Sequence, residues 1–174
     1  MPDLVRPSNA GADEVAVAHQ RVGAYGVLLR GNRTRILMTR IAQKDYGAGL
    51  WTLPGGGLDH GEDPIDAVVR EFREETSLRI IPGPIRLINS AHFLGRNRAG
   101  VLEDFHGLSI IYDVHPQPGS DLDALTILEA NSSTDHVEWL DATAIYDRST
   151  DTFDRGYSAA ARAAIRSLGT STNT

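Results

Sequence analysis

Three glutamates are spaced so that their carboxylates fall on one side of a helix. Glu71, Glu74 and Glu75 stand at positions i, i+3 and i+4, which lie within one sector of a helical wheel. Two carboxylates about 6 Å apart repel each other by roughly 2–3 kcal/mol at an effective dielectric constant near 20. A hard divalent cation offsets this repulsion, and Mg²⁺ prefers carboxylate oxygens together with substrate phosphates. The spacing therefore indicates either a charged face in solvent or a site for a divalent cation.

A glycine triplet upstream favours the cation site. Gly55, Gly56 and Gly57 follow a short apolar segment and precede Glu62 and the helix. Glycine lets the backbone approach a ligand closely and adopt positive φ. A glycine triplet alone is more often a turn than a ligand-binding loop. Its position directly before an acidic helix predicts that it contacts a ligand beside the carboxylates.

The helix that carries the glutamates has clear start signals. Asp63 is a typical N-cap, Pro64 suits the first helical position, and Asp66 places negative charge in the first turn. We expect the helix to end near Thr76. Ala67 falls within the acidic sector, where a small residue leaves room for a ligand. The residues expected to face the core from the adjoining stripe are Ile65, Val68, Val69 and Phe72.

These residues form a pattern that resembles the Nudix box. The segment 56–78 reads GGLDHGEDPIDAVVREFREETSL. The positions that match the family pattern are Gly56, Glu62, Arg70, Glu71, Phe72, Glu74, Glu75 and Leu78. Ser77 stands where the family has glycine. Because that glycine ends the helix, we expect Ser77 either to adopt a left-handed conformation, at a cost of about 1–2 kcal/mol, or to shift the helix end.

The resemblance implies an activity and a cofactor. Nudix hydrolases cleave a nucleoside diphosphate linked to another group X, releasing a nucleoside monophosphate and phosphorylated X. The implied cofactor is Mg²⁺ or Mn²⁺, and its implied ligands are Glu71, Glu74, Glu75 and the Gly56 carbonyl. Arg70 is expected to orient the glutamates by ion pairing, and Glu62 to support the site. A non-catalytic nucleotide sensor or regulator on the same fold is the alternative, and Ser77 is the one departure that favours it.

The general base and the substrate contacts are less well defined by the sequence. The base is either Glu71 or an acid on a distant loop, for which Glu103 and Asp104 are the candidates. The expected partner is a small-molecule nucleotide. The residues expected to bind it are Arg40, Gly55, Gly56, Gly57 and Phe105. Family members are often homodimers, so the resemblance includes a homodimer among the expected states.

Further elements must position this site. The strands expected from β-rich or alternating patterns span 21–30, 35–40, 85–93, 108–114 and 136–140, and a second helix is expected over 157–168. This order predicts a mixed α/β or α+β fold. The resemblance implies an α/β/α sandwich, with a mixed, curved β-sheet flanked by the box helix and a C-terminal helix. Residues 1–18 are expected to be a loosely ordered lead-in, 19–169 a single domain and 170–174 a disordered tail.

Composition is consistent with this organisation. The chain has 174 residues, of which 41% are hydrophobic, enough for one packed domain. The absence of cysteine excludes disulfides and thiolate zinc sites and fits a cytoplasmic location. The net charge of −6 argues against binding to nucleic acid or to an anionic membrane. Most of this charge lies in the box segment, where a cation would neutralise it.

Overall fold

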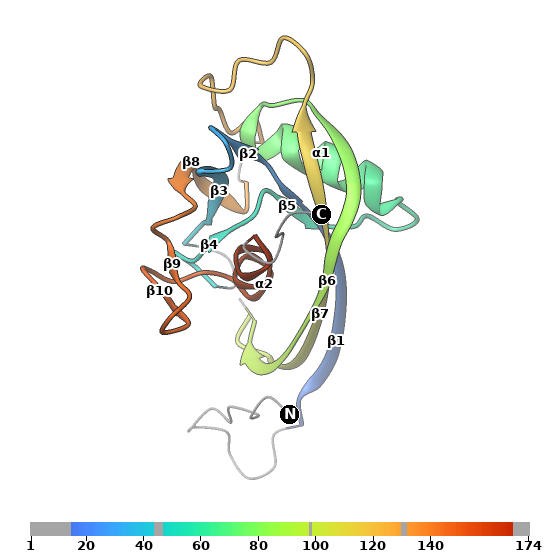
Figure 1. Cartoon of the computed structure of the whole chain (residues 1–174). Coiled ribbons are helices and arrows are strands. Elements are labelled where there is room, and N and C mark those ends of the chain that lie inside the picture. The colour runs from blue at the N-terminus through green and yellow to red at the C-terminus, as the bar shows by residue number, and fades with distance from the viewer. Residues whose placement is uncertain (1–14, 44–46, 98, 130–131, 169–174) are drawn as a thin grey trace.

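Two four-stranded β-sheets, a short hairpin and two α-helices make up the described part of the chain (Figure 1). The computed structural model describes residues 15–43, 47–97, 99–129 and 132–168. In chain order the elements are β1 (Val17–Val27), β2 (Leu29–Arg30), β3 (Arg35–Ile41), β4 (Trp51–Thr52), β5 (Gly55–Gly57), α1 (Pro64–Thr76), β6 (Ile80–Arg96), β7 (Leu102–Pro116), β8 (Thr134–Asp141), β9 (Tyr146–Asp147), β10 (Thr152–Phe153) and α2 (Ala159–Ser167).

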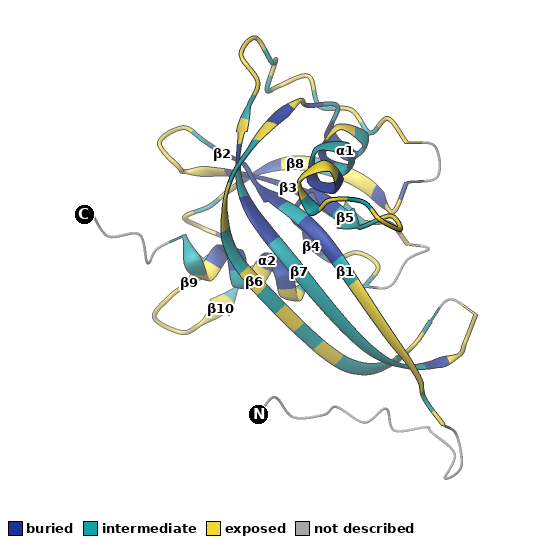
Figure 2. Ribbon diagram, turned by 90° about the vertical axis from the view of Figure 1, so that its right-hand side faces the viewer, coloured by how far each residue is buried: buried dark blue, intermediate teal, exposed yellow. Residues whose placement is uncertain are grey.

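The first sheet is mixed and has the order β5-β1-β7-β6. β1 and β7 are parallel over their shared length, whereas β1 with β5 and β6 with β7 are antiparallel. The sheet is long and curved, and Figure 2 shows that most of its half away from α1 is exposed or partly exposed. The glycine triplet is strand β5 at one edge of this sheet, so the sheet sets the position of the glycines relative to β1.

The second sheet is antiparallel and joins strands distant in sequence. β3 pairs with β2, β4 and β8, so β3 is its central strand. The turn between β2 and β3 contains Gly31, Asn32 and Arg33, all with positive φ, as the expected hairpin requires.

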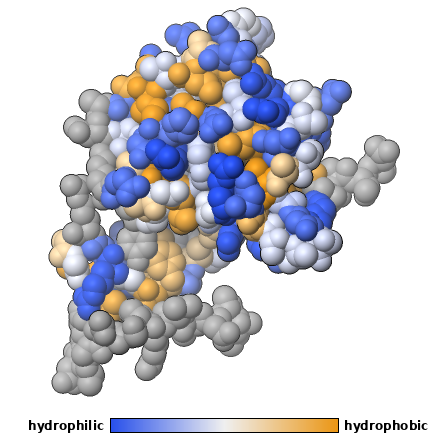
Figure 3. All heavy atoms as spheres, turned by 90° about the vertical axis from the view of Figure 1, so that its left-hand side faces the viewer, coloured by the Kyte–Doolittle hydropathy of each residue, from blue (hydrophilic) through white to orange (hydrophobic). Residues whose placement is uncertain are grey.

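On the left-hand side of the molecule in Figure 1, which faces the viewer in Figure 3, hydrophilic and hydrophobic residues are interspersed.

The two helices cover opposite faces of the mixed sheet and create two hydrophobic cores. Val68 and Phe72 of α1 pack with Ala24 of β1 in one core. Ala161 and Ile165 of α2 pack in the other. None of the helices in the described ranges is long and apolar enough to cross a membrane.

The face of α1 that packs on the sheet differs from the expected stripe. Ile65 is 49% exposed, whereas Ala67, expected beside a ligand, is fully buried. The buried positions of α1 also include Glu75. The helix is therefore rotated so that the side carrying two of the glutamates faces the sheet. The small Ala67 side chain allows this close approach.

Several strands are longer than the sequence pattern predicts. β1 begins at Val17, inside the expected lead-in, and the expected strand 21–30 is divided between β1 and β2. β7 begins at Leu102, so Glu103 and Asp104 lie in a strand and the expectation of a loop is wrong. β6 continues through Pro82 and Pro84, because an edge strand tolerates proline. Residues 1–14 and 169–174 are outside the described residues, and the expectations for them stay untested.

Candidate functional site

Local signals define both ends of helix α1. The Asp63 side chain accepts a hydrogen bond from the Ile65 amide at 2.8 Å, and Pro64 occupies the first turn. At the other end Ser77 has φ 64° and ψ −6°, and its amide donates to the Arg73 carbonyl at 2.9 Å. The left-handed alternative for Ser77 is confirmed, and its hydroxyl also donates to the Ala124 carbonyl at 3.0 Å. The departure from the family glycine therefore leaves the helix end intact.

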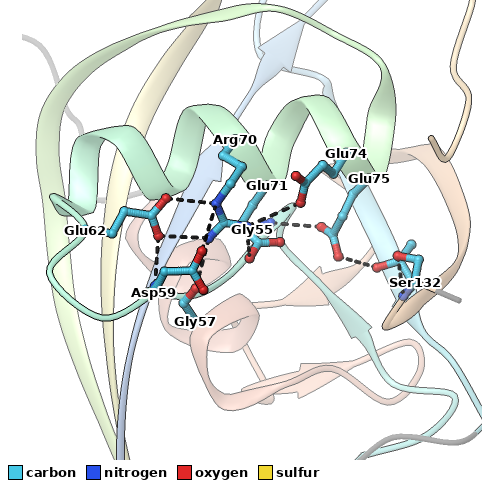
Figure 4. A network of polar contacts seen from close by, with 10 residues as sticks. Gly55, Gly57, Asp59, Glu62, Arg70, Glu71, Glu74, Glu75 and Ser132 are labelled. Carbon is cyan, nitrogen blue, oxygen red and sulfur yellow. Dashed lines mark hydrogen bonds and ion pairs between the residues drawn. The ribbon is translucent and has the colours of Figure 1, made fainter. Parts of the chain in front are cut away.

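The Arg70 guanidinium forms ion pairs with four carboxylates, two on α1 and two in the segment before it (Figure 4). Arg70 donates through Nε and Nη2 to the two oxygens of Glu62, at 2.8 and 2.9 Å. Its Nη1 donates to Glu71 at 2.9 Å and to Glu74 at 3.3 Å, and Nη2 also donates to the Gly57 carbonyl at 3.2 Å. The Arg70 hydrogen bonds hold the pKa of Glu62 at about 2. Arg70 is thus placed to orient the glutamates, and Glu62 anchors Arg70.

Glu75 is turned the other way, into the interior. It is 2% exposed and accepts hydrogen bonds from the Gly55 amide, at 2.9 Å, and from the Thr134 hydroxyl of β8. Burial raises the pKa of Glu75 to about 8, despite those two hydrogen bonds, and the nearby charge of Glu71 raises it further. The neutral form of Glu75 is therefore favoured at pH 7 when no cation is near.

Glu71 lies directly on the glycine strand. A Cβ atom on Gly56 would stand 2.5 Å from Oε1 of Glu71, so only glycine leaves space for this carboxylate. The Glu71 side chain is 14% exposed, and burial raises its pKa although Arg70 is bound to it. Gly56 pairs with Ala24 of β1 at this point. The glycine triplet is thus shaped to receive a carboxylate from α1.

The donor chemistry of the site fits a divalent cation. Glu71, Glu74 and Glu75 are hard oxygen donors, and the charged forms of Glu71 and Glu75 are disfavoured by burial. Within the described residues, however, no three His, Cys, Asp or Glu side chains are arranged so that they could hold a metal ion. Glu71 and Glu74 point to Arg70 instead. Both would have to turn from this guanidinium to reach a shared cation.

Arg40 is paired outside the site, and the two candidate general bases of β7, Glu103 and Asp104, lie far from α1. Nε of Arg40 pairs with Asp135 at 2.7 Å. Glu103 pairs in register with Val17 of β1, seven residues before the partner of Gly56, which is roughly 23 Å of strand. Asp104 follows it in β7. Neither acid is brought to the glycine strand.

These distal residues have partners of their own. Glu103 accepts from Asn97 at 2.8 Å and lies 3.3 Å from Nδ1 of His19. Phe105 lies between the rings of Phe93 and His19, at centroid distances of 5.1 and 5.4 Å. It pairs in register with His19, roughly 17 Å along β1 from the partner of Gly56. The structure therefore does not bring Phe105 to the site.

The sequence does not assign to the site three residues that lie near it. Thr134 binds Glu75 from β8, and no sequence signal connects two residues 59 positions apart. Arg21 and Tyr25 of β1 lie against the glycine strand. Their alternation with Gly23 predicts that they share one face of a strand, but not that this face meets the glycines.

Comparisons with known proteins agree with this geometry. The family model described as NUDIX domain matches residues 19–161. An RNA pyrophosphohydrolase of Rhizobium meliloti (strain 1021) is 39% identical over 56 residues, which are 32% of each protein. The matches to the first curated relatives cover from about a fifth to half of those proteins.

Solved structures share the fold. A MutT NUDIX hydrolase from Burkholderia pseudomallei superposes with a TM-score of 0.63 at 22% identity, over 86% of this chain and 98% of that one. A MutT protein from Methanosarcina mazei Go1 superposes with a TM-score of 0.61 at 19% identity, over 84% and 91% of the two chains. These similarities confirm the predicted fold class. Apart from the β9–β10 hairpin, the strands of the described residues form two sheets, one mixed and one antiparallel, where the resemblance implies one mixed sheet.

Proposed function

The chain belongs to the NUDIX family, and from this premise we propose that it hydrolyses the pyrophosphate bond of a nucleoside diphosphate linked to another group. The products would be a nucleoside monophosphate and the phosphorylated second group. The observation that carries the proposal is the arrangement of α1: Glu71 and Glu75 contact β5, burial raises the pKa of both, and Glu74 shares the Arg70 guanidinium with Glu71. Such shifts are typical of functional sites.

Members of the family generally use divalent metal ions, and we propose Mg²⁺ or Mn²⁺ here, held by Glu71, Glu74 and Glu75, with the Gly56 carbonyl as a further ligand. A bound cation would neutralise the diphosphate oxygens and favour attack by water on phosphorus. Arg70 would stay tethered to Glu62 while the two neighbouring glutamates turn toward the ligand.

We assign the proton acceptor to Glu71 rather than to an acid of β7. Its raised pKa brings it closer to neutral pH, where a general base is most effective. Its carboxylate also lies on the glycine strand, where the diphosphate would bind. Glu103 and Asp104 lie roughly 20 Å away along the sheet. A single-turnover pH profile that keeps its acidic limb, the fall in rate at low pH, in E103Q and D104N, and loses that limb in E71Q, would support the assignment.

The test is a substrate screen with and without Mg²⁺, followed by product identification. The panel contains nucleoside triphosphates, nucleotide sugars, ADP-ribose, dinucleoside polyphosphates and coenzyme A. An RNA with a 5′ triphosphate is included because curated relatives are RNA pyrophosphohydrolases. The proposal expects release of a nucleoside monophosphate, or of pyrophosphate from the RNA, only with the cation.

Matched variants locate the activity. Glu74→Gln removes one carboxylate of the site, whereas Glu138→Gln removes an exposed carboxylate of β8 that lies near His136. We expect loss of turnover in the first variant and normal turnover in the second. Full activity of Glu74→Gln, or of the wild type in excess chelator, would contradict the proposal. Ligand-induced thermal stabilisation without turnover across the panel would favour the sensor alternative.

A further inference from the structure

Arg21 differs from the other arginines near the glycine strand because its guanidinium has no hydrogen-bond or ion-pair partner among the residues that the structure describes. Arg70 is paired with four carboxylates, and Arg40 is paired with Asp135. Arg21 is exposed, and across the described ranges of the chain its side chain makes no hydrogen bond or ion pair. It is therefore a cation available to a ligand.

The strand geometry directs Arg21 onto the end of the glycine triplet. Arg21, Gly23 and Tyr25 share one face of β1, and Gly23 pairs with Gly57 of β5. Nη2 of Arg21 lies 2.5 Å from the position that a Cβ atom would occupy on Gly57. The absence of a side chain at Gly57 is thus what allows the guanidinium to lie there.

The opposite charge approaches the adjoining residue from the other face. Glu71 lies against Gly56, and consecutive Cα atoms are only about 3.8 Å apart. Burial is the main cause that raises the pKa of the Tyr25 phenol. The charge of Arg21 lowers this pKa, and the charges of Glu75 and Glu71 raise it. All three side chains are therefore close to the Tyr25 ring. Because β5 is the end strand of its sheet, a ligand at its free edge can contact both sides.

A diphosphate needs such a second cationic group. One divalent cation at three carboxylates leaves the site and its ligand with excess negative charge, since Arg70 is already engaged. A guanidinium offers two parallel N–H groups that match two phosphate oxygens. This inference rests on the proposed function, because it assumes a diphosphate substrate. We propose that Arg21 binds one phosphate group of the diphosphate and gives the site its preference for two linked phosphates over one.

The test measures ligand binding without turnover. Methylenediphosphonate, in which carbon replaces the bridging oxygen, is titrated calorimetrically with Mg²⁺ into the wild type, R21M, R21K and R79M. Arg79 is also exposed and follows α1, so R79M controls for the loss of one positive charge. We expect R21M to bind roughly 10–100-fold more weakly, R21K to be intermediate because it lacks the planar fork, and R79M to stay within about twofold of the wild type.

Binding of R21M within twofold of R79M would overturn the inference, and so would a wild type that binds methylenediphosphonate no better than methylphosphonate. Turnover of a substrate from the screen gives a second readout. We expect R21M to raise KM while kcat changes little, because a ground-state contact is lost. If the wild type releases no product but binds the probe through Arg21, the proposed hydrolysis fails, whereas the binding of two linked phosphates by Arg21 stands. If the wild type is active and R21M matches R79M in binding and KM, only the inference fails.

Discussion

The α1 site and the far end of the β1–β7–β6 sheet both contain carboxylates near basic groups, but the pKa values of Glu71 and Glu75 shift in the opposite direction to that of Glu103. Burial raises the pKa of Glu71 and Glu75. Hydrogen bonds from Asn97 and His19 lower the pKa of Glu103. The negative charge of Glu103 is thus stabilised by the groups around it, whereas that of Glu71 and Glu75 is not.

This difference separates a structural contact from a candidate site. Arg70 is shared among four carboxylates, so neither Glu71 nor Glu74 has this cation to itself. A ligand that brings positive charge would relieve α1 and do little for Glu103. The same substitution made in both regions should therefore have very different effects.

The largest expected difference is in activity. Glu71→Gln keeps the shape of the side chain against Gly56 and removes its charge. We expect kcat/KM to fall by about 10²–10³, because a ligand of the cation and the assigned proton acceptor is lost. Glu103→Gln should stay within about twofold of the wild type. Equal losses in the two variants, measured at saturating Mg²⁺ with a substrate from the screen, would show that the comparison is wrong.

The next difference concerns the space available for a side chain at two glycines, one in each region. Gly55 has φ 141°, and a Cβ atom there would stand 2.6 Å from the Cα atom of Tyr25. Gly100, between β6 and β7, has φ 81° and nothing within 4 Å of its Cβ position. We expect Gly55→Ala to lower the free energy of unfolding by more than about 3 kcal/mol, from strain and overpacking, and Gly100→Ala by about 1 kcal/mol. Similar denaturant midpoints for the two variants would argue against a tightly packed β5.

Stability should depend on pH with opposite sign in the two regions. The pKa of Glu75 is raised to about 8, so its protonated form stabilises the fold fully below the ordinary pKa of 4.5, and this contribution is lost as pH rises through about 8. The pKa of Glu103 is lowered, so its contribution is present above 4.5 and lost as pH falls through the folded value.

Thermal unfolding in chelator tests this prediction. Between pH 5 and 9, E75Q should lose part of the wild-type decline in Tm, whereas E103Q should keep it. Below pH 4, E103Q should be less sensitive to acid than the wild type. A wild-type Tm that rises from pH 6 to 9, with the same rise in E75Q, would contradict the raised pKa.

The smallest expected effect is at the end of α1. Ser77 has positive φ, which glycine adopts without strain, and its hydroxyl donates to Ala124. We expect Ser77→Ala to be less stable than Ser77→Gly by about 1–2 kcal/mol, with the wild type between them. Urea midpoints measure this order, and an alanine variant at least as stable as the glycine variant would refute it.

The sequence predicts α1 well because its signals are local. Asp63 and Pro64 define its start, and the family glycine position gives a left-handed Ser77 as one of two alternatives, which the structure selects. Its rotation is not local, because Ile65 is exposed and Glu75 buried only once the sheet is in place. The hydrophobic stripe alone cannot assign two carboxylates to the inner face.

Strand lengths are predicted less well for a related reason. From the sequence, the first residues of β7 are expected to form a polar loop, because Glu103 and Asp104 precede the apolar residues of the expected strand 108–114. It forms a strand because β1 and β6 pair with it along its length. Contacts between residues that are far apart in the sequence, such as Thr134 and Glu75, leave no periodic pattern in either segment.

Mn²⁺ binding measured by electron paramagnetic resonance tests the central claim most directly. Free Mn²⁺ is counted during titration of the wild type, E74Q and D104N. The account predicts that the wild type binds Mn²⁺, that E74Q weakens this binding at least tenfold, and that D104N leaves it unchanged. Unchanged binding in E74Q, with loss of binding in D104N, would place the cation in the distal region and contradict the account.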